Sequence, residues 1–190
     1  MASKVLSIFM KRTILFAILC AGLIFSSLGL DPKAKAQNKP KRGEQVATKT
    51  DTSKPPITDT TLSDIQSMVR ARKAGKFAPN DPCVTADPIT MGQAVNGTLA
   101  NGDCIRTNGS AIDFYDFQGT SGQAIFVSMN SNAFDTFLFL IDDLGNIIDY
   151  NDDSGSTTDS RIPIGGGVMT LPYTGDFIIG ASSYGPSIGP

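Results

Sequence analysis

The residues best suited to chemistry lie in an acidic stretch between positions 149 and 159. Asp149, Asn151 and Asp153 alternate as D-x-N-x-D, with Asp152 and Asp159 close by. Calcium takes about six to eight oxygen ligands, and short carboxylates two residues apart can converge on one ion where the chain curves. We therefore interpret these five residues as candidate calcium ligands, with calcium as the expected cofactor.

This stretch differs from an EF-hand calcium loop. Ser154 stands where that loop requires glycine, and Ser160 stands where it requires a bidentate glutamate. The alternative interpretation is an ordinary polar loop, because Asp, Asn, Ser and Gly are the residues that favour turns. Calcium binding and a plain loop both stay open at this point.

Catalytic groups are scarce in this sequence. The chain contains no histidine, which excludes Ser-His-Asp and Cys-His arrangements and HExxH zinc chemistry within it. Residues 83–190 contain no lysine for a Ser-Lys dyad. Asp153-Ser154-Gly155 matches the D-[ST]-G of aspartic proteases, and residues 178–180 mimic their second motif, but only 25 positions separate them. We expect no enzyme; a small aspartic-type hydrolase acting as a dimer is an alternative.

Charge excludes two classes of partner. Residues 83–190 carry twelve aspartates against Arg106 and Arg161, a net charge of −10. A segment this acidic does not bind nucleic acid or an anionic membrane through charge. The expected partner is instead an extracellular polymer or a protein surface.

The N-terminus predicts export. Lys11 and Arg12 precede an apolar stretch at 13–30, and Ala34-Lys35-Ala36 follows as a small-x-small site. This order is typical of a secretory signal peptide cleaved after Ala36, and a membrane anchor is the alternative. Met10 opens a compact signal start by itself, which would make residues 1–9 the product of an upstream start codon. The expected location is secreted, periplasmic or cell-surface.

Two cysteines remain after that cleavage, Cys83 and Cys104. Two cysteines in an oxidising compartment usually pair, so we expect a disulfide between them, with two buried free thiols as the alternative.

Short strands must position these loops. Extended segments spaced about ten residues apart, with turn residues between them, predict an all-β sandwich or barrel. The segment 136–141 is apolar on both faces, as a central strand can be. The predicted strands are 92–99, 112–117, 123–129, 136–141, 147–150, 162–171 and 176–181. The predicted core residues are Tyr115, Phe117, Ile125, Val127, Met129, Leu138, Leu140, Ile162 and Ile178.

A polar segment precedes the strands. Residues 37–82 read as a solvated linker that contains one short helix at about 61–74, with Thr61 and Asp64 at capping-box spacing. Leu62, Ile65, Met68 and Val69 share one helical face. The helix could pack on the sandwich, fray in solution or bind a partner. The predicted domains are a signal peptide at 1–36, the linker at 37–82 and the sandwich at 83–190.

The strand-rich part resembles a known family. Its motifs are Asp113–Phe117, Gly122-Gln123, the FDTxL strand at Phe134–Leu138, the D-x-x-G turn at Asp142–Gly145, the NDD loop at Asn151–Asp153 and the glycine-aromatic strand at Gly175–Gly180. In this order they resemble the bacterial pre-peptidase C-terminal (PPC) domain, over about 92–190. The resemblance implies a jelly-roll-like antiparallel β-sandwich that serves secreted proteases as a non-catalytic accessory module; relatives in collagenases bind collagen and calcium.

The chain departs from that family in two respects. Residues 37–82 are too few for a protease domain, and the sequence stops at Pro190, where the family continues with another short strand. The main expectation is therefore an exported accessory or binding module. The alternative is a fragment of a longer secreted hydrolase, with a covalently linked catalytic domain as its partner and a sandwich truncated at its last strand.

The export interpretation predicts the N-terminus of the exported protein. Cleavage after Ala36 should give a chain beginning at Gln37, which intact mass and N-terminal sequencing would show. Exported material that still begins at Met1 or Met10 would contradict the prediction.

Overall fold

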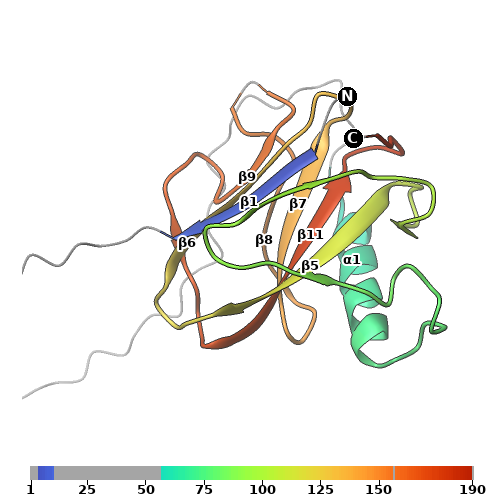
Figure 1. Ribbon diagram of the computed structural model, residues 1–190, viewed down its shortest axis with the longest axis horizontal. Helices are drawn as coiled ribbons and strands as arrows, with labels where there is room; N and C mark the ends of the chain where they lie inside the picture. The colour runs from blue at the N-terminus through green and yellow to red at the C-terminus, as the bar shows by residue number, and fades with distance from the viewer. Residues whose placement is uncertain (1–3, 11–56, 156, 190) are drawn as a thin grey trace, which may run out of the picture. The chain divides into compact units, whose positions relative to one another are not determined.

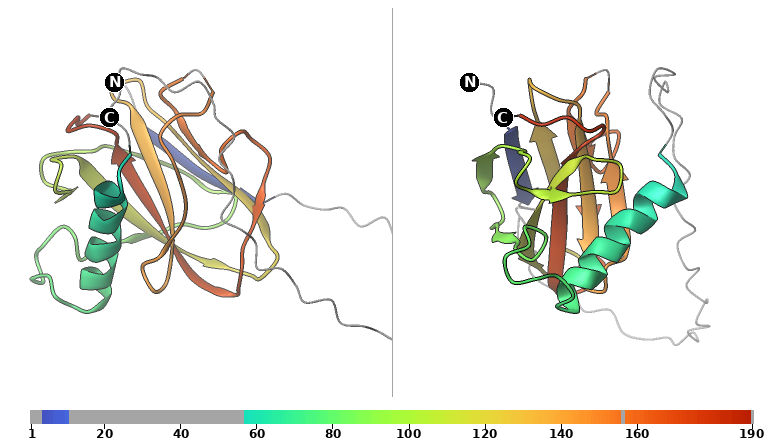
Figure 2. Two further views of the ribbon diagram at one scale, coloured as in Figure 1. Left: turned by 180° about the vertical axis from the view of Figure 1, so that it is seen from behind. Right: turned by 90° about the vertical axis from the view of Figure 1, so that its right-hand side faces the viewer.

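The fold is a β-sandwich with a helix on one of its outer faces (Figures 1 and 2). The structure is a computed structural model that describes residues 4–10, 57–155 and 157–189. Within these residues two sheets face one another, and one helix, α1 (Asp59–Lys73), packs against the second sheet. The expected all-β sandwich is confirmed.

The sheet under the helix, sheet B, has the strand order β2-β5-β11-β7-β8, with β4 also paired to β5. Its pairings are antiparallel except for β2, which runs parallel to β5. The bounds are β2 Asp87–Pro88, β4 Cys104–Ile105, β5 Ala111–Gly119, β7 Thr136–Asp142, β8 Ile147–Asn151 and β11 Gly175–Ser183.

The opposite sheet, sheet A, has the order β10-β6-β1-β3, with β9 also paired to β6. All its described pairings are antiparallel. The bounds are β1 Lys4–Met10, β3 Ala94–Gly97, β6 Ala124–Asn130, β9 Ser160–Ile162 and β10 Met169–Thr170.

Alternation along the strands of sheet B produces two apolar layers. On β7, Leu138 and Leu140 lie in the core between the sheets, whereas Phe137 and Phe139 lie in the layer under the helix. Successive strand side chains point to opposite faces, so a strand that is apolar on both must be covered on both. All nine predicted core residues are buried, although Ile178 belongs to the helix-side layer.

The helix provides that second cover. Ile65 and Val69 are fully buried in the layer over sheet B. Arg72 Nη2 donates to Asp116 Oδ1 on β5 at 2.9 Å, and Arg70 Nη2 donates to Asn146 Oδ1 at 3.0 Å. Of the three alternatives for the helix, packing on the sandwich is what the structure shows.

The helix begins earlier than predicted. Its N-cap is Thr58, whose side chain accepts from the backbone N–H of Thr61, so the predicted cap at Thr61 is wrong. Asp64 caps nothing; its carboxylate accepts from the N–H of Thr107 instead. At the other end Gly75 has φ +62°, a conformation that glycine adopts without strain and that closes the last turn.

Beyond shifts of strand ends, the strands differ from the prediction in two respects. The predicted strand 162–171 is two short strands, β9 and β10, because Gly165, Gly166 and Gly167 all have positive φ between them. The sandwich expected at 83–190 also includes β1, which the sequence assigned to the leader. The apolar stretch 13–30, the cleavage site after Ala36 and most of the linker lie outside the described residues.

The core between the sheets gives a stability prediction. Leu138 is 0 % exposed and packs in that core, so Leu138→Ala removes buried methyl groups and leaves a cavity. We expect a loss of about 2–5 kcal/mol in the free energy of unfolding, measured by urea denaturation. Leu144→Ala is the control, because Leu144 is 69 % exposed. Equal losses in the two variants would contradict this account of the core.

Candidate functional site

The predicted calcium residues lie on β8 and in the loop from β8 to β9. Asp149 and Asn151 are on β8 opposite Leu140 and Leu138 of β7. Asp152, Asp153 and Asp159 belong to the loop that follows. The structure therefore distributes the five residues along an edge strand and the loop after it.

Asp149 is a half-buried carboxylate. Burial raises its pKa above the ordinary value, while the N–H of Tyr150, which donates to Asp149 Oδ1 at 2.9 Å, acts in the opposite direction. Burial disfavours the charged form of a carboxyl group. A cation bound beside Asp149 would offset that cost.

The oxygens of Asn151 and Asp159 already accept hydrogen bonds from the backbone. Asn151 is 3 % exposed, and its Oδ1 accepts from the N–H of Arg161 at 2.9 Å. Asp159 Oδ1 accepts from the N–H of Ser131 at 3.4 Å. These bonds tie the loop to β9 and to the turn before β7.

Two hydroxyl groups also hold the base of the loop from β8 to β9. Ser160 Oγ donates to the backbone carbonyl of Asp152 at 3.0 Å and lies 2.7 Å from Thr136 Oγ1. Thr136 in turn donates both its N–H and its Oγ1 to the carbonyl of Thr158. The base of the loop is thus held by buried polar contacts, which is the role that Asn and Ser residues commonly have in turns.

These contacts limit what the loop can do with a metal. Among the described residues, no group of three or more His, Cys, Asp or Glu side chains lies within reach of a common ion. A calcium ion here would have to draw ligands from backbone carbonyls and water as well as from one or two carboxylates. Calcium binding stays a prediction.

The aspartic-protease-like motifs occupy unrelated positions. Asp153-Ser154-Gly155 lies in the loop, where the N–H of Ser154 donates to the carbonyl of Asp159 at 2.6 Å. Residues 178–180 form the middle of β11, paired on both sides, and supply core side chains but no carboxylate. An aspartic dyad needs two carboxyl groups that share a proton.

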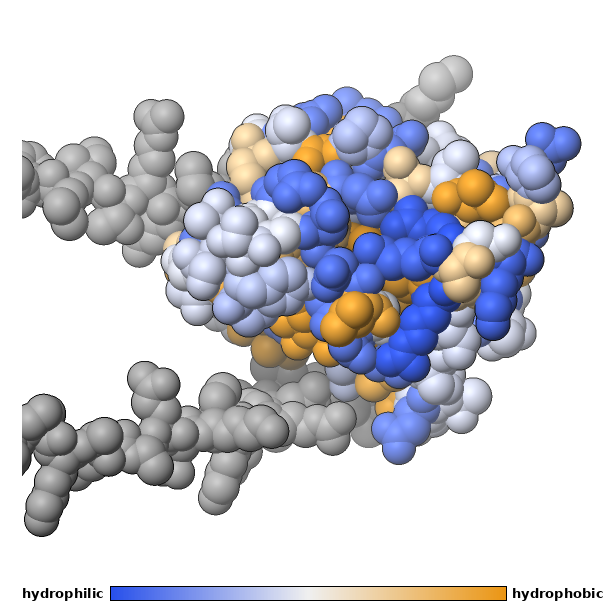
Figure 3. Space-filling model, turned by 90° about the horizontal axis from the view of Figure 1, so that it is seen from below, coloured by the Kyte–Doolittle hydropathy of each residue, from blue (hydrophilic) through white to orange (hydrophobic). Residues whose placement is uncertain are grey.

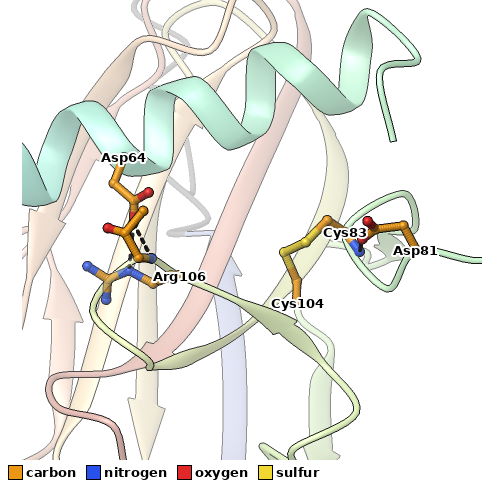
Figure 4. The surroundings of a disulfide bond; sticks show 6 residues. Asp64, Asp81, Cys83, Cys104 and Arg106 are labelled. Carbon is orange, nitrogen blue, oxygen red and sulfur yellow. Dashed lines mark hydrogen bonds and ion pairs between the residues drawn. A yellow bond between two sulfur atoms is a disulfide. The ribbon is translucent and has the colours of Figure 1, made fainter. Parts of the chain in front are cut away.

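Sequence reasoning missed a buried arginine under the helix. Arg106 is 2 % exposed, and its guanidinium lies over the rings of Phe137 and Phe139 at 5.5 and 5.4 Å. Asp64 Oδ2 from α1 is 3.8 Å from Arg106 Nε (Figure 4). Burial lowers the pKa of Arg106, and Asp64 opposes that shift. The available signal was that Arg106 is one of only two basic residues among residues 83–190.

The predicted disulfide is confirmed beside this arginine. Cys83 and Cys104 are joined with an S–S distance of 1.96 Å and a Cα–Cα distance of 4.6 Å (Figure 4). Asp81 Oδ1 accepts from the N–H of Cys83 at 2.8 Å. Both cysteines lie in the apolar layer between sheet B and the helix, which the bond closes at one end.

A second buried cation lies in the layer between the two sheets. Lys4, the first residue of β1, is 0 % exposed, and its Nζ donates to Asp113 Oδ2 of β5 at 2.5 Å. The same Nζ lies 5.6 Å from the centre of the Tyr115 ring. Burial raises the pKa of Asp113, and Lys4 opposes the shift. The sequence could not indicate this pair while Lys4 was assigned to a leader.

The face drawn in Figure 3 shows no broad apolar area. In Figure 3 apolar residues appear as separate patches among hydrophilic ones. Among the residues that the structure describes, the exposed large apolar side chains are Ile105, Leu144, Ile164, Val168 and Ile188. Within the described residues no helix is long and apolar enough to cross a membrane.

Comparison of the chain with protein-family models, with curated proteins and with solved structures found no match in any of the three.

The acidic loop gives a test for calcium. Extracellular modules often bind calcium with a Kd of about 10⁻⁴–10⁻³ M, and a free concentration about ten times Kd adds about 1.4 kcal/mol to stability. Calcium should therefore raise the Tm by several degrees in differential scanning calorimetry. Magnesium should do less, because it gives up its water shell reluctantly.

Charge screening is the competing explanation. Sodium chloride at matched ionic strength should not reproduce the calcium shift, and Asp153→Asn combined with Asp159→Asn should abolish it. Asp176→Asn, at an exposed position on β11, removes a charge outside the loop and controls for the loss of a single charge. If sodium chloride gives the whole shift, or the double variant keeps it, the loop does not bind calcium.

Proposed function

We propose that this chain is an exported, non-catalytic β-sandwich module that binds an extracellular polymer or protein surface. In this respect it resembles the PPC domains that accompany secreted bacterial proteases. The expected location is secreted, periplasmic or cell-surface. The charge, apolar stretch and small-x-small site of the N-terminus support the export part of the proposal.

The observation that carries the proposal is the disulfide between Cys83 and Cys104. Structural disulfides persist in oxidising compartments and are rare in the reducing cytosol of mesophiles. This bond joins β4 to the segment before β2, within the layer under the helix. In the chain-entropy description, closing a loop of this length stabilises the fold by about 3 kcal/mol.

The chemical inventory supports a binding role over a catalytic one. The chain offers no histidine, and residues 83–190 offer no lysine. The two arginines of that segment serve packing: Arg106 is buried under the helix, and Arg161 lies 3.9 Å from the centre of the Phe126 ring. Aspartates remain, and they suit hydrogen bonding to hydroxyl or amide groups, or a shared cation.

Retention on insoluble polymers without turnover tests this proposal. The purified chain, incubated with insoluble collagen, cellulose or peptidoglycan, should sediment with at least one of them and release no soluble peptide or sugar. The Asp153→Asn variant should sediment equally. The Cys83→Ser/Cys104→Ser variant should lose binding at a temperature where it is unfolded.

The hydrolase alternative gives the opposite result. Soluble product that accumulates with the wild-type chain and disappears with Asp153→Asn would assign an aspartic-type activity. Retention on none of the three polymers would count against the binding role. A chain found only in the cytoplasm, with both thiols of Cys83 and Cys104 free to titrate, would overturn export.

A further inference from the structure

Strand β1 fills a position in the middle of sheet A. It pairs antiparallel with β6 on one side and with β3 on the other. Among the described strands, β3 has no other partner in the sheet. Without β1, both β6 and β3 would present a row of unpaired backbone N–H and C=O groups, which is a template for another strand.

The inward side chains of β1 complete the core. Leu6 and Ile8 are 0 % exposed and lie in the apolar cluster between the two sheets. The backbone of Ile8 also bonds beyond β3: its N–H donates to the carbonyl of Gln93 at 3.3 Å, and its carbonyl accepts from the N–H of Gly92 at 2.7 Å. The position therefore accepts two aliphatic side chains, two residues apart.

At one end of the space between β3 and β6, the surroundings favour a cation. Lys4 Nζ reaches Asp113 Oδ2, and the charges of Asp87 and Asp103 act on the same carboxylate. Gly97, which pairs with Lys4, leaves room for its side chain, because an added Cβ would lie 3.0 Å from Lys4 Cε. The Asp113 side chain is 28 % exposed, and removing a carboxylate from water without an opposite charge is costly, so this end selects a basic residue.

The chain after residue 82 cannot supply that cation. It has no lysine, Arg106 lies in the helix-side layer, and the guanidinium of Arg161 donates to the carbonyl of Gly167. In the structure the basic residue comes with the inserted strand, as Lys4. In the structure that strand is the chain's own N-terminus, the segment that cleavage after Ala36 would remove.

We propose that the space between β3 and β6 is a β-strand-addition site for an extended peptide with a basic residue at its first inward position and aliphatic residues two and four positions later. Lys4, Leu6 and Ile8 are the resident example of this pattern. The peptide runs antiparallel to both neighbours, so that its main chain gives affinity and its alternate side chains give specificity. In the exported protein the occupant is a segment of a partner.

That a partner segment occupies the site rests on the proposed function, because export with cleavage after Ala36 would remove β1. The ability of the space between β3 and β6 to bind a peptide does not depend on export. The experiment below uses purified full-length chain, so its failure would leave the sedimentation and localisation results untouched. A cytoplasmic chain would equally leave the binding result untouched.

The test uses a full-length chain whose own strand cannot insert. Leu6→Asp with Ile8→Asp places two charges where the core requires aliphatic groups. A fluorescent peptide with the sequence of residues 3–11 should bind this variant saturably in an anisotropy titration, and should not bind the wild-type chain over the same range. If the variant does not fold alone, the peptide present during refolding should restore a cooperative thermal transition.

Charge selection is tested with a second peptide. Glutamate in place of lysine at the position of Lys4 should weaken binding by about tenfold or more, because it brings like charges together beside Asp113. Methionine there should also weaken binding, and this difference should shrink when Asp113→Asn is added to the variant. Asp176→Asn, exposed on β11, is the matched control and should leave the difference unchanged.

Three results would overturn the proposal. One is that the peptide neither binds the Leu6→Asp/Ile8→Asp variant saturably nor restores its folding. Another is equal affinity for the lysine and glutamate peptides. The third is binding of the same peptide to the wild-type chain with equal affinity, because the peptide site would then lie outside the space that β1 fills.

Discussion

The structure depends on one constraint: sheet B is apolar on both of its faces. Strand β7 supplies leucines to one face and phenylalanines to the other, and β5 and β11, on one side of it, also place apolar side chains on both faces. Each face must be removed from water, since burying one large apolar side chain contributes about 1.5–3 kcal/mol. Sheet A covers one face, and α1 with the disulfide-linked segment covers the other (Figure 2). The three layers follow from that need.

Among the described residues, Lys4 is buried in one apolar layer and Arg106 in the other, and the two cations are stabilised differently. Lys4 has a carboxylate at 2.5 Å, whereas Arg106 has its carboxylate at 3.8 Å and rests on two phenylalanine rings. Guanidinium is flat and weakly hydrated, so it can stack where an ammonium group needs a close counter-charge. Each pair also joins two elements distant in sequence, β1 to β5 and α1 to the segment after β4.

Local patterns in the sequence predicted much of the fold. The alternation in 112–117 and 123–129 predicted which side chains are buried, and the two-faced apolar run at 136–141 predicted a covered central strand. The cysteine pair followed from compartment and number. The three successive glycines at 165–167 were a readable signal for the break between β9 and β10, but the apolar residues on either side suggested one strand.

The missed features depend on contacts between distant residues. Strand β1 is a short segment of seven residues beside a stronger charge-and-apolar pattern, and its partners lie beyond residue 90. The burial of Lys4 and Arg106 could not be read from residue type, because a buried charge is tolerated only where a distant segment supplies its partner. For the acidic loop the residue types indicated candidate calcium ligands, whereas the hydrogen bonds of Asn151 and Asp159 depend on how the loop folds back.

The disulfide has a consequence for β3. This strand lies within the covalent ring that Cys83 and Cys104 close, a separation of 21 residues, together with β2, which is anchored to β5. A strand in such a ring has few places to go when its neighbour is withdrawn, because the ring limits how far its ends can separate. The ring therefore reduces the conformational entropy that β3 could gain by detaching from the sheet. The ring thus holds β3 in place on one side of the space that β1 fills. A strand that binds there loses its own conformational entropy, but little further entropy is lost in ordering β3.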